Sequence, residues 1–320
     1  MTNTIPKKAL VALPDFAGGL DGAASRPYLI VPPEQALVPA FDRSFHFGDS
    51  LYEVTRSYEG VLFSLDEHLR RLTRSCELAY FEILPDVDRI RSLVNETCRA
   101  FFNRFGNRDI YVRVVVSRGY GDLNIDRATA SEPYSLVYVK ELEPFSQKLY
   151  DTGMHYAVVP RRRNPPSALD PAMKSGNYLN NVLALVEAKR MGASDAILLS
   201  QQGFVTEGTT NNVHIVTAGE VWTAPLSVGI LAGITRDWVF QLGRQEGIKV
   251  QERLYTESDI YSAQEMFLTS ATKEVMPITT VSGRPIGDGK PGPVTRKLHV
   301  AMRKLIKDYT AKHKSESVYV

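Results

Sequence analysis

The sequence has 320 residues, of which 43% are hydrophobic and 9% aromatic, so it can form two cores and wholesale disorder is excluded. Basic and acidic residues number 38 and 36, a formal net charge of +2 that argues against a dedicated nucleic-acid binder. No apolar run reaches about 18 residues and no charged-then-apolar leader is visible, so we expect a cytoplasmic protein with neither a transmembrane segment nor a signal peptide.

The first 140 residues alternate extended and helical patterns, which predicts a smaller α+β domain over residues 1–140. Residues 9–13 and 51–58 have extended patterns, and Ser64 followed by Glu67 is a capping-box pattern that predicts the start of a helix. Apolar residues then recur at helical spacing: Leu69, Leu72, Cys76 and Ala79. A second helix is predicted from about Val87, with one apolar face: Ile90, Val94, Cys98, Phe101 and Phe105. Strands are predicted at residues 110–117 and 134–140.

Residues 141–153 are polar, contain a proline and have no clean period, so we expect them to form an interdomain linker. Residues 154–320 then form a larger C-terminal domain. Its predicted helices are residues 177–191, with Leu179, Val182, Leu183 and Val186 apolar, residues 235–243, and a basic helix from about residue 294. Its predicted strands are residues 155–160, 196–200, 213–216, 221–223, 248–254 and 265–269. We expect the tail from residue 307 to be frayed.

Several common catalytic patterns are missing from the sequence. No strand is followed by a Rossmann glycine fingerprint, no P-loop is present, and the six histidines include no HExxH pattern. No serine lies in a GxSxG pattern, and no metal site is predicted. Cys76 and Cys98 form no disulfide framework or CxxC site, and we expect both to be buried thiols on the apolar faces of their helices.

Short polar segments in the second half carry the residues that suggest chemistry. Lys174 lies where a loop meets a helix and could attack a carbonyl if shielded, although a surface lysine is the commoner situation. Glu207 places a carboxylate at a strand–turn. Residues 233–235 (Gly-Ile-Thr) and residues 269–272 offer backbone N–H groups and hydroxyls for an anion, although the first is also an ordinary helix start. Arg71 could add a phosphate contact. Lysine, carboxylate and anion cradle together are what pyridoxal phosphate requires.

These segments, in this order, resemble the class IV (fold type IV) pyridoxal-phosphate aminotransferases. The resemblance covers residues 41–278 and rests on HFGDSLYEVTRSYEG, LDEHLRRLTRSC, YVRVVVSRG, MKSGNYLNNVLALVEAKRMGASDAILLSQQGFVTEGTTNNVHIV, ILAGITR and FLTSATKEVMPIT. The lysine block followed by TEGTTNN is the most specific part. The family implies a two-domain α/β (α+β) fold with pyridoxal 5'-phosphate in the interdomain cleft, and an active site completed by a second subunit, so a homodimer or higher homo-oligomer is expected.

The resemblance also implies roles for individual residues. Lys174 would form the internal aldimine and later move a proton between Cα and C4′, and Glu207 would keep the pyridine nitrogen protonated. Arg71 would bind the phosphate together with the two anion segments, whose residues are Gly233, Ile234, Thr235, Ser270, Ala271 and Thr272. Ala271 would contribute only its backbone N–H. Tyr178 would hydrogen-bond the phenolic oxygen, and Asn212 would brace its loop.

The substrate pocket implied by the resemblance is mixed. The block after Lys174 is similar to branched-chain aminotransferases, whereas Leu51–Val54 is closer to D-amino-acid transaminases. Arg118 lies where D-specific enzymes place a carboxylate-binding arginine, but the Arg-x-His that accompanies it there is missing. Arg56 is a second candidate for the carboxylate, or a partner in a surface ion pair. We predict that the substrate contacts include Tyr52, Arg56, Arg118 and Thr272.

The predicted activity is ping-pong transamination from an amino acid, with branched-chain L-amino acids favoured, to a 2-oxo acid such as 2-oxoglutarate. The alternatives on the same scaffold are D-amino-acid or (R)-amine transamination and β-elimination of the aminodeoxychorismate-lyase type. A non-catalytic protein that keeps the fold is disfavoured by the Lys174–Glu207 pair. Nucleic-acid binding through Arg161–Arg163 is disfavoured because the run has no aromatic interleaving. No membrane partner is expected.

Overall fold

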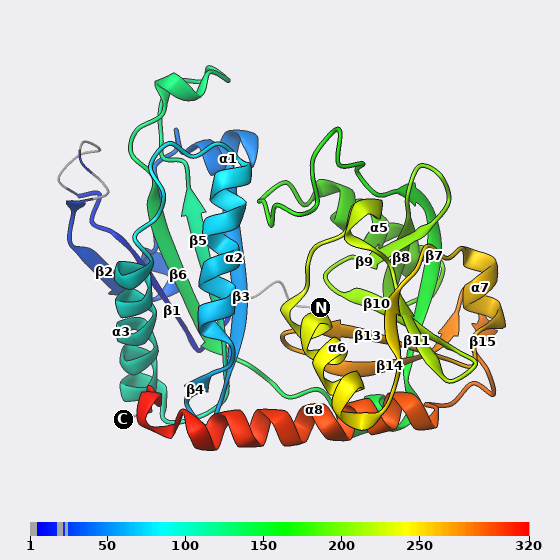
Figure 1. Cartoon of the computed structure of the whole chain (residues 1–320). Helices are drawn as coiled ribbons and strands as arrows, with labels where there is room; N and C mark the ends of the chain where they lie inside the picture. The colour runs from blue at the N-terminus through cyan, green and yellow to red at the C-terminus, as the bar shows by residue number, and fades with distance from the viewer. Residues whose placement is uncertain (1–4, 18–21, 23–24, 320) are drawn as a thin grey trace. The chain divides into compact units, whose positions relative to one another are not determined.

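The computed structural model describes residues 5–17, 22 and 25–319 (Figure 1). The chain divides into two compact units, which we describe separately. The first unit comprises the chain up to Glu143, the short segment Met173–Asn177 and the chain from Tyr309 onward, and the second comprises Pro144–Ala172 and Tyr178–Asp308. No helix in the described part of the chain is long and apolar enough to cross a membrane.

The first unit contains an antiparallel six-stranded sheet in the order β2-β1-β6-β5-β3-β4. Its strands are β1 Ala9–Pro14, β2 Tyr28–Val31, β3 Ser50–Tyr58, β4 Val61–Leu62, β5 Ile110–Ser117 and β6 Tyr134–Glu141. Two long helices, α2 Leu65–Leu78 and α3 Val87–Phe105, cover one face of this sheet (Figure 1). A short helix, α1 Arg43–Phe47, precedes β3, and the 3-10 turns are Pro33–Gln35 and Arg127–Thr129.

The two long helices follow the apolar periodicity of the sequence. Leu69, Leu72 and Cys76 of α2 are at most 1% exposed, as are Val94 and Cys98 of α3. The predicted capping box of α2 is wrong. Ser64 occupies the N-cap position with a left-handed φ of 55° and makes no side-chain cap hydrogen bond, because its carboxylate partner in the pattern is not used there.

The segment that carries Lys174 was expected in the C-terminal domain but packs with the first unit. The backbone N–H of Tyr52 donates to the carbonyl of Lys174 at 2.8 Å, and that of Gly176 donates to the carbonyl of Ser50 at 2.7 Å. Lys174 and its neighbours therefore lie beside β3 as a short extra strand, which binds them to the first unit by main-chain hydrogen bonds.

The expectation of a frayed tail is also wrong. The last helix, α8 Pro293–Lys312, is followed by a 3-10 turn at Lys314–Glu316 and by residues that dock on the first unit. Val318 is 1% exposed, belongs to the core under α2 and α3, and donates its N–H to the carbonyl of Gly60 at 3.0 Å. An apolar side chain that finds a core pocket orders the chain end that carries it.

The second unit contains a nine-stranded mixed sheet with strand order β12-β11-β10-β13-β14-β7-β8-β9, and β15 pairs with β14. Because β9 pairs with β10 as well as with β8, part of the sheet closes into a ring. The strands are β7 Met154–Arg162, β8 Asp195–Leu199, β9 Val205–Gly208, β10 Asn212–Thr217, β11 Glu220–Thr223, β12 Val250–Glu252, β13 Glu265–Ser270, β14 Glu274–Val281 and β15 Arg284–Pro285. The other elements are α4 Gln147–Thr152, α5 Leu179–Arg190, α6 Ile234–Glu246, α7 Glu257–Ser262 and the 3-10 turn Leu226–Val228.

Helix α5 buries its small residues and exposes its large apolar ones. Ala184 and Ala188 are fully buried against β7 and β8, and Asn181 is 4% exposed. The exposed residues are the apolar ones singled out in the sequence: Leu179 (67%), Val182 (52%), Leu183 (36%) and Val186 (42%). Small side chains allow a helix to approach a sheet closely, so the alanine face packs and the larger side chains are left outside.

Candidate active site

Lys174 lies against the side chain of Tyr52. Its Nζ is 3.3 Å from Tyr52 Oη, to which it donates, and 4.4 Å from the centre of the Tyr52 ring. Its backbone N–H donates to Ser75 Oγ at 3.3 Å. The lysine is half-buried, and an aromatic ring and hydroxyl hold its amine in one place. This is the shielded lysine that the sequence suggested, and not one extended into solvent.

Arg113 of β5 also stacks on Tyr52 and was missed in the sequence. Its Cζ lies 3.9 Å from the centre of the Tyr52 ring. Because Val54 pairs with Arg113 in the antiparallel register of β3 and β5, Tyr52 and Arg113 lie diagonally on one face of the sheet. Among the described residues, Arg113 makes no ion pair. The signal available in the sequence was its place among Tyr111 and Val115, on the face opposite the buried positions of the strand.

Arg71, the predicted phosphate arginine, is held by Glu53. Its Nε donates to Glu53 Oε1 at 2.6 Å and its Nη2 to Glu53 Oε2 at 2.8 Å. His68 Nδ1 is 2.7 Å from the same Oε2. Burial alone would raise the pKa of Glu53, but Arg71 and His68 outweigh it and lower this pKa to about 2. Neither Glu53 nor His68 was singled out in the sequence.

The two arginines predicted to bind a substrate carboxylate have other partners. Arg56 Nη2 donates to Asp109 Oδ2 at 2.8 Å, so Arg56 forms the ion pair that was its alternative assignment. Arg118 Nε donates to Asp49 Oδ2 at 2.7 Å, and its Nη2 donates to the carbonyl of Ala79 at 2.7 Å.

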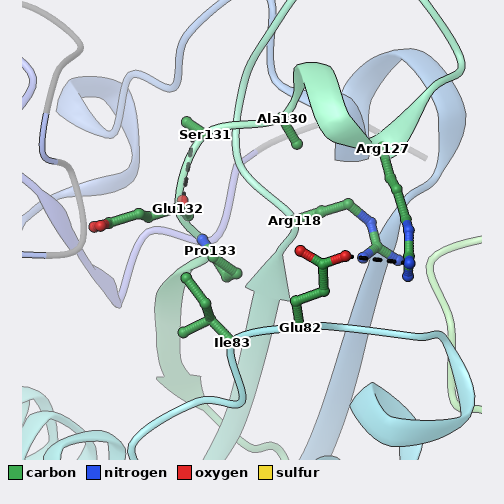
Figure 2. Close-up of a pocket in the computed structure, with 8 residues that line it drawn as sticks. All are labelled: Glu82, Ile83, Arg118, Arg127, Ala130, Ser131, Glu132 and Pro133. Atoms are coloured by element: carbon green, nitrogen blue, oxygen red, sulfur yellow. Dashed lines mark hydrogen bonds and ion pairs between the residues drawn. The ribbon is translucent and has the colours of Figure 1, made fainter.

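Figure 2 shows Arg118 at the edge of a pocket of about 330 Å³ in the first unit. Arg127 lies beside it and pairs with Glu82 at 3.1 Å. The walls are completed by Ile83, Ala130, Ser131, Glu132 and Pro133. Since two glutamates balance the two arginines, the pocket has no net charge that would favour a carboxylate.

In the second unit, Glu207 at the end of β9 is buried and receives several hydrogen bonds. Arg163 Nε donates to its Oε1 at 3.0 Å, and the N–H of Leu231 donates to its Oε2 at 3.0 Å. Asn212 Nδ2 lies 3.4 Å from Oε2 and 3.0 Å from the carbonyl of Leu231. A carboxylate beside a guanidinium stays ionised, and Asn212 links it to the loop before α6. This geometry agrees with the bracing role inferred for Asn212.

The predicted anion segments also lie in the second unit. Gly233 is the N-cap of α6 and provides no side chain, so no side-chain oxygen caps the N–H groups of Ile234 and Thr235. Only glycine fits at 233, because a Cβ there would lie 2.0 Å from Asn212 Oδ1. The turn Ser270–Thr272 follows β13 and is half-buried, and Ser270 Oγ accepts from the N–H of Lys273 at 3.1 Å.

A buried carboxylate that the sequence did not suggest supports the Glu207 loop. Asp195 accepts hydrogen bonds from Thr209 Oγ1 at 2.5 Å, Asn211 Nδ2 at 3.0 Å and Tyr156 Oη at 3.2 Å. Asn181 of α5 donates to the carbonyl of Thr209 at 2.7 Å. These contacts fix the chain directly after Glu207. Tyr178, the N-cap residue of α5, is half-buried.

The structure thus assembles the predicted site in two halves. The first unit brings together Lys174, Tyr52 and, through Glu53, Arg71. The second unit contains Tyr178, Glu207, Gly233, Ile234, Thr235, Ser270, Ala271 and Thr272.

Comparison with known proteins identifies the family. A model of the family described as Amino-transferase class IV matches residues 50–281. The chain belongs to the class IV aminotransferases. The enzyme is therefore an aminotransferase of fold type IV that uses pyridoxal 5'-phosphate, the cofactor of the class.

Three relatives illustrate the similarity. A Methanocaldococcus jannaschii protein named "Putative branched-chain-amino-acid aminotransferase" is 39% identical over 268 residues, which are 84% of this chain and 91% of that protein. The D-alanine aminotransferase of Bacillus licheniformis is 33% identical over 271 residues, covering 85% and 92%. The branched-chain amino acid aminotransferase of T.th. superposes with a TM-score of 0.83 with pyridoxamine 5'-phosphate and 0.82 with N-(5'-phosphopyridoxyl)-L-glutamate. Its identity is 28% and 27%, and both superpositions cover 96% of this chain and 98% of that one.

The residues present fit the cofactor. An amine held on a tyrosine, a buried ionised carboxylate and a helix start without a side-chain cap are the partners that a carbonyl, a pyridine nitrogen and a phosphate require.

Proposed function

We propose that this enzyme transfers the amino group of an amino acid, with branched-chain L-amino acids as the favoured donors, to a 2-oxo acid such as 2-oxoglutarate. The two half-reactions follow each other in a ping-pong sequence on one cofactor. The observation that carries the proposal is the placement of the Lys174 amine on Tyr52, in a chain that also holds Glu207 ionised beside Arg163. The relative with 39% identity is named for branched-chain substrates, which supports the choice of donor.

The protein's own residues have distinct tasks in this reaction. Pyridoxal phosphate, when bound, supplies an electron sink that stabilises negative charge at the substrate Cα. Lys174 Nζ removes the proton from that Cα, and Tyr52 Oη keeps the amine in position between turnovers. Glu207 holds a proton on the ring nitrogen, since its own charge is fixed by Arg163. Tyr178 hydrogen-bonds the phenolic oxygen.

The phosphate would be bound by residues from both units. Arg71 offers a guanidinium, and the start of α6 offers the N–H groups of Ile234 and Thr235, with Gly233 leaving room for close approach. The turn Ser270–Thr272 adds hydroxyls and N–H groups, with Ala271 limited to its backbone. In this proposal Thr272 also reaches the substrate.

We assign the substrate carboxylate first to Arg113. It lies on the Tyr52 ring beside the Lys174 amine, and it makes no ion pair within the part of the chain that the structure describes. An arginine stacked on an aromatic ring keeps its guanidinium edge for bidentate recognition of a carboxylate. Arg118 and Arg56 remain the competing candidates, each with a carboxylate partner of its own.

The proposed functional unit is a homodimer or higher homo-oligomer. The loop after β5 exposes two large apolar side chains, Leu123 (57%) and Ile125 (82%), and Phe45 of α1 is 76% exposed. Arg43 holds this loop rigidly, with donors at 2.8 Å from the carbonyl of Asn124 and 3.0 Å from that of Ile125. A rigid loop that presents apolar side chains is typical of a protein interface. The exposed apolar side chains of α5 form a second such surface.

A screen of amino donors tests the function. L-Leucine, L-valine, D-alanine and (R)-phenylethylamine are each offered with 2-oxoglutarate or pyruvate, and the chirality of the product is measured. We expect turnover with the L-donors. Turnover of only the D- or (R)-donors would overturn the branched-chain assignment and favour the second candidate, which the 33% identity to a D-alanine aminotransferase keeps in view. The Lys174→Ala variant is the control, and it should be inactive and resist borohydride labelling at position 174.

A further inference from the structure

Neighbouring residues of β3 serve two different groups of side chains. Tyr52 contacts Lys174 and Arg113, whereas Glu53, the next residue, contacts α2. Successive side chains of a strand point to opposite faces, so the two cannot share a task. Glu53 is 2% exposed, and its task is therefore to be sought in what it contacts on the α2 side.

Both oxygens of Glu53 are committed to α2. The Arg71 guanidinium bonds to it side-on, through Nε at 2.6 Å and Nη2 at 2.8 Å, and His68 Nδ1 approaches the second oxygen at 2.7 Å. Side-on bidentate pairing fixes both the position and the plane of a guanidinium. It uses one edge of the group, and the edge formed by Nη1 and the second Nη2 hydrogen is a different one.

The pair is unusual in being buried on one side only. The Arg71 side chain is 15% exposed, against 2% for that of Glu53 and 5% for that of His68. Removing charges from water is costly, and buried ion pairs are on average a poor way to stabilise a fold. A buried acid that holds the inner edge of a partly exposed arginine is better explained by what the outer edge must bind.

We infer that Glu53 is a positioning residue, which together with His68 holds Arg71 so that its outer edge receives the cofactor phosphate. The inference rests on the phosphate role proposed above for Arg71. Free arginine side chains lose considerable rotamer freedom on binding, and a preformed ion pair removes that loss in advance. Glu53 itself does not touch the cofactor.

The test compares two ligands on the full chain stripped of its cofactor. Pyridoxal 5'-phosphate and pyridoxal differ only in the phosphate, and the dissociation constant of each is measured by absorbance. Glu53→Gln should weaken binding of pyridoxal 5'-phosphate by about 10-fold or more and leave that of pyridoxal unchanged. Glu53→Asp, which keeps the charge but shortens the side chain, is the second variant and should lower the same ratio of affinities. Glu67→Gln is the matched control, because Glu67 forms an exposed pair with Arg70 on the same helix.

A double-mutant cycle separates the outcomes. In an Arg71→Met background, Glu53→Gln should cause no further loss of pyridoxal 5'-phosphate affinity. Equal loss for both ligands, or a loss that persists without Arg71, would show that Glu53 supports the fold and not the phosphate arginine. An unchanged ratio in both Glu53 variants overturns the inference as well. If Arg71→Met alone leaves the ratio unchanged, it is the proposed phosphate role of Arg71 that fails.

Discussion

Single side chains decide which arginine is available to a substrate. Arg56, Arg113 and Arg118 all lie on or directly after the paired strands β3 and β5 of the first unit, and the sequence favoured the first and the last. In the structure those two are bonded to Asp109 and Asp49, whereas Arg113 stacks on the tyrosine that holds the lysine amine. Ion pairing is a property of tertiary neighbours, so the choice among equivalent arginines could not come from spacing alone.

Replacing Arg113 by methionine tests the carboxylate assignment. We expect Arg113→Met to raise KM for the amino donor by about 10-fold or more, because a charged bidentate hydrogen bond to the carboxylate is lost. Arg118→Met should instead lower thermal stability with little change in KM, since it removes bonds to Asp49 and to the carbonyl of Ala79. Steady-state kinetics of both variants decide the matter. A raised KM in Arg118→Met alone would place the carboxylate at Arg118.

At the scale of elements, apolar periodicity located the helices but not always their buried face. For α2 and α3 the large apolar side chains are buried. For α5 the alanines and Asn181 face the sheet, and the four larger residues face outward. A stripe of exposed apolar residues on a helix that already packs through its other side indicates a second packing surface.

Charge substitution on that stripe tests the interface. Val182→Glu should shift the protein from dimer to monomer in sedimentation velocity without loss of helix content, because it places a charge in an apolar contact. Ile125→Glu tests the loop of the first unit in the same way. By contrast, Ala184→Leu overfills a buried site and should cost about 1–3 kcal/mol of stability. If both glutamate variants remain dimeric, neither surface forms the dimer.

At the scale of the whole molecule, buried histidines set the response to acid. Burial lowers the pKa of His68, His214 and His299, and for His214 the nearby charge of Arg236 adds to the effect. His214 is fully buried, with its ring stacked on Phe267 at 4.6 Å and Nε2 at 3.0 Å from Thr269 Oγ1. Its pKa lies well below 6.5, so the native state keeps it neutral in mildly acidic solution.

This depressed pKa predicts a loss of stability below neutral pH. The unfolded chain takes up a proton near pH 6.5 and the native chain does so only at lower pH, so the unfolded state binds more protons and stability falls as pH falls. From pH 8 to pH 5 His214 would account for up to about 2 kcal/mol of that fall. Urea unfolding at both pH values should show a smaller difference for His214→Phe than for the wild type. The exposed His46→Gln serves as control, and an unchanged difference in His214→Phe would contradict the prediction.

Much of the architecture was accessible to local reasoning. Strand β5 occupies the predicted residues 110–117, α3 begins at the predicted Val87, and Ala218 and Gly219 form the expected hairpin turn with positive φ values of 52° and 77°. These features depend on period, capping and turn chemistry, all of which act over a few residues. The family followed from ordered motifs, and the match over residues 50–281 confirms it.

Other features depend on residues far apart in the chain, and the amino-acid pattern contains no local sign of them. Met173–Asn177 joins the first unit through hydrogen bonds to β3, and Val318 docks in the first core. Glu53 meets Arg71 and His68 only because α2 packs on β3. The sequence therefore specified the types of residue that the chemistry needs and the elements that carry them. Which of these residues meet, which charges pair and which face of a helix is buried were set by long-range packing, because contact free energies depend on neighbours that only the folded chain brings together.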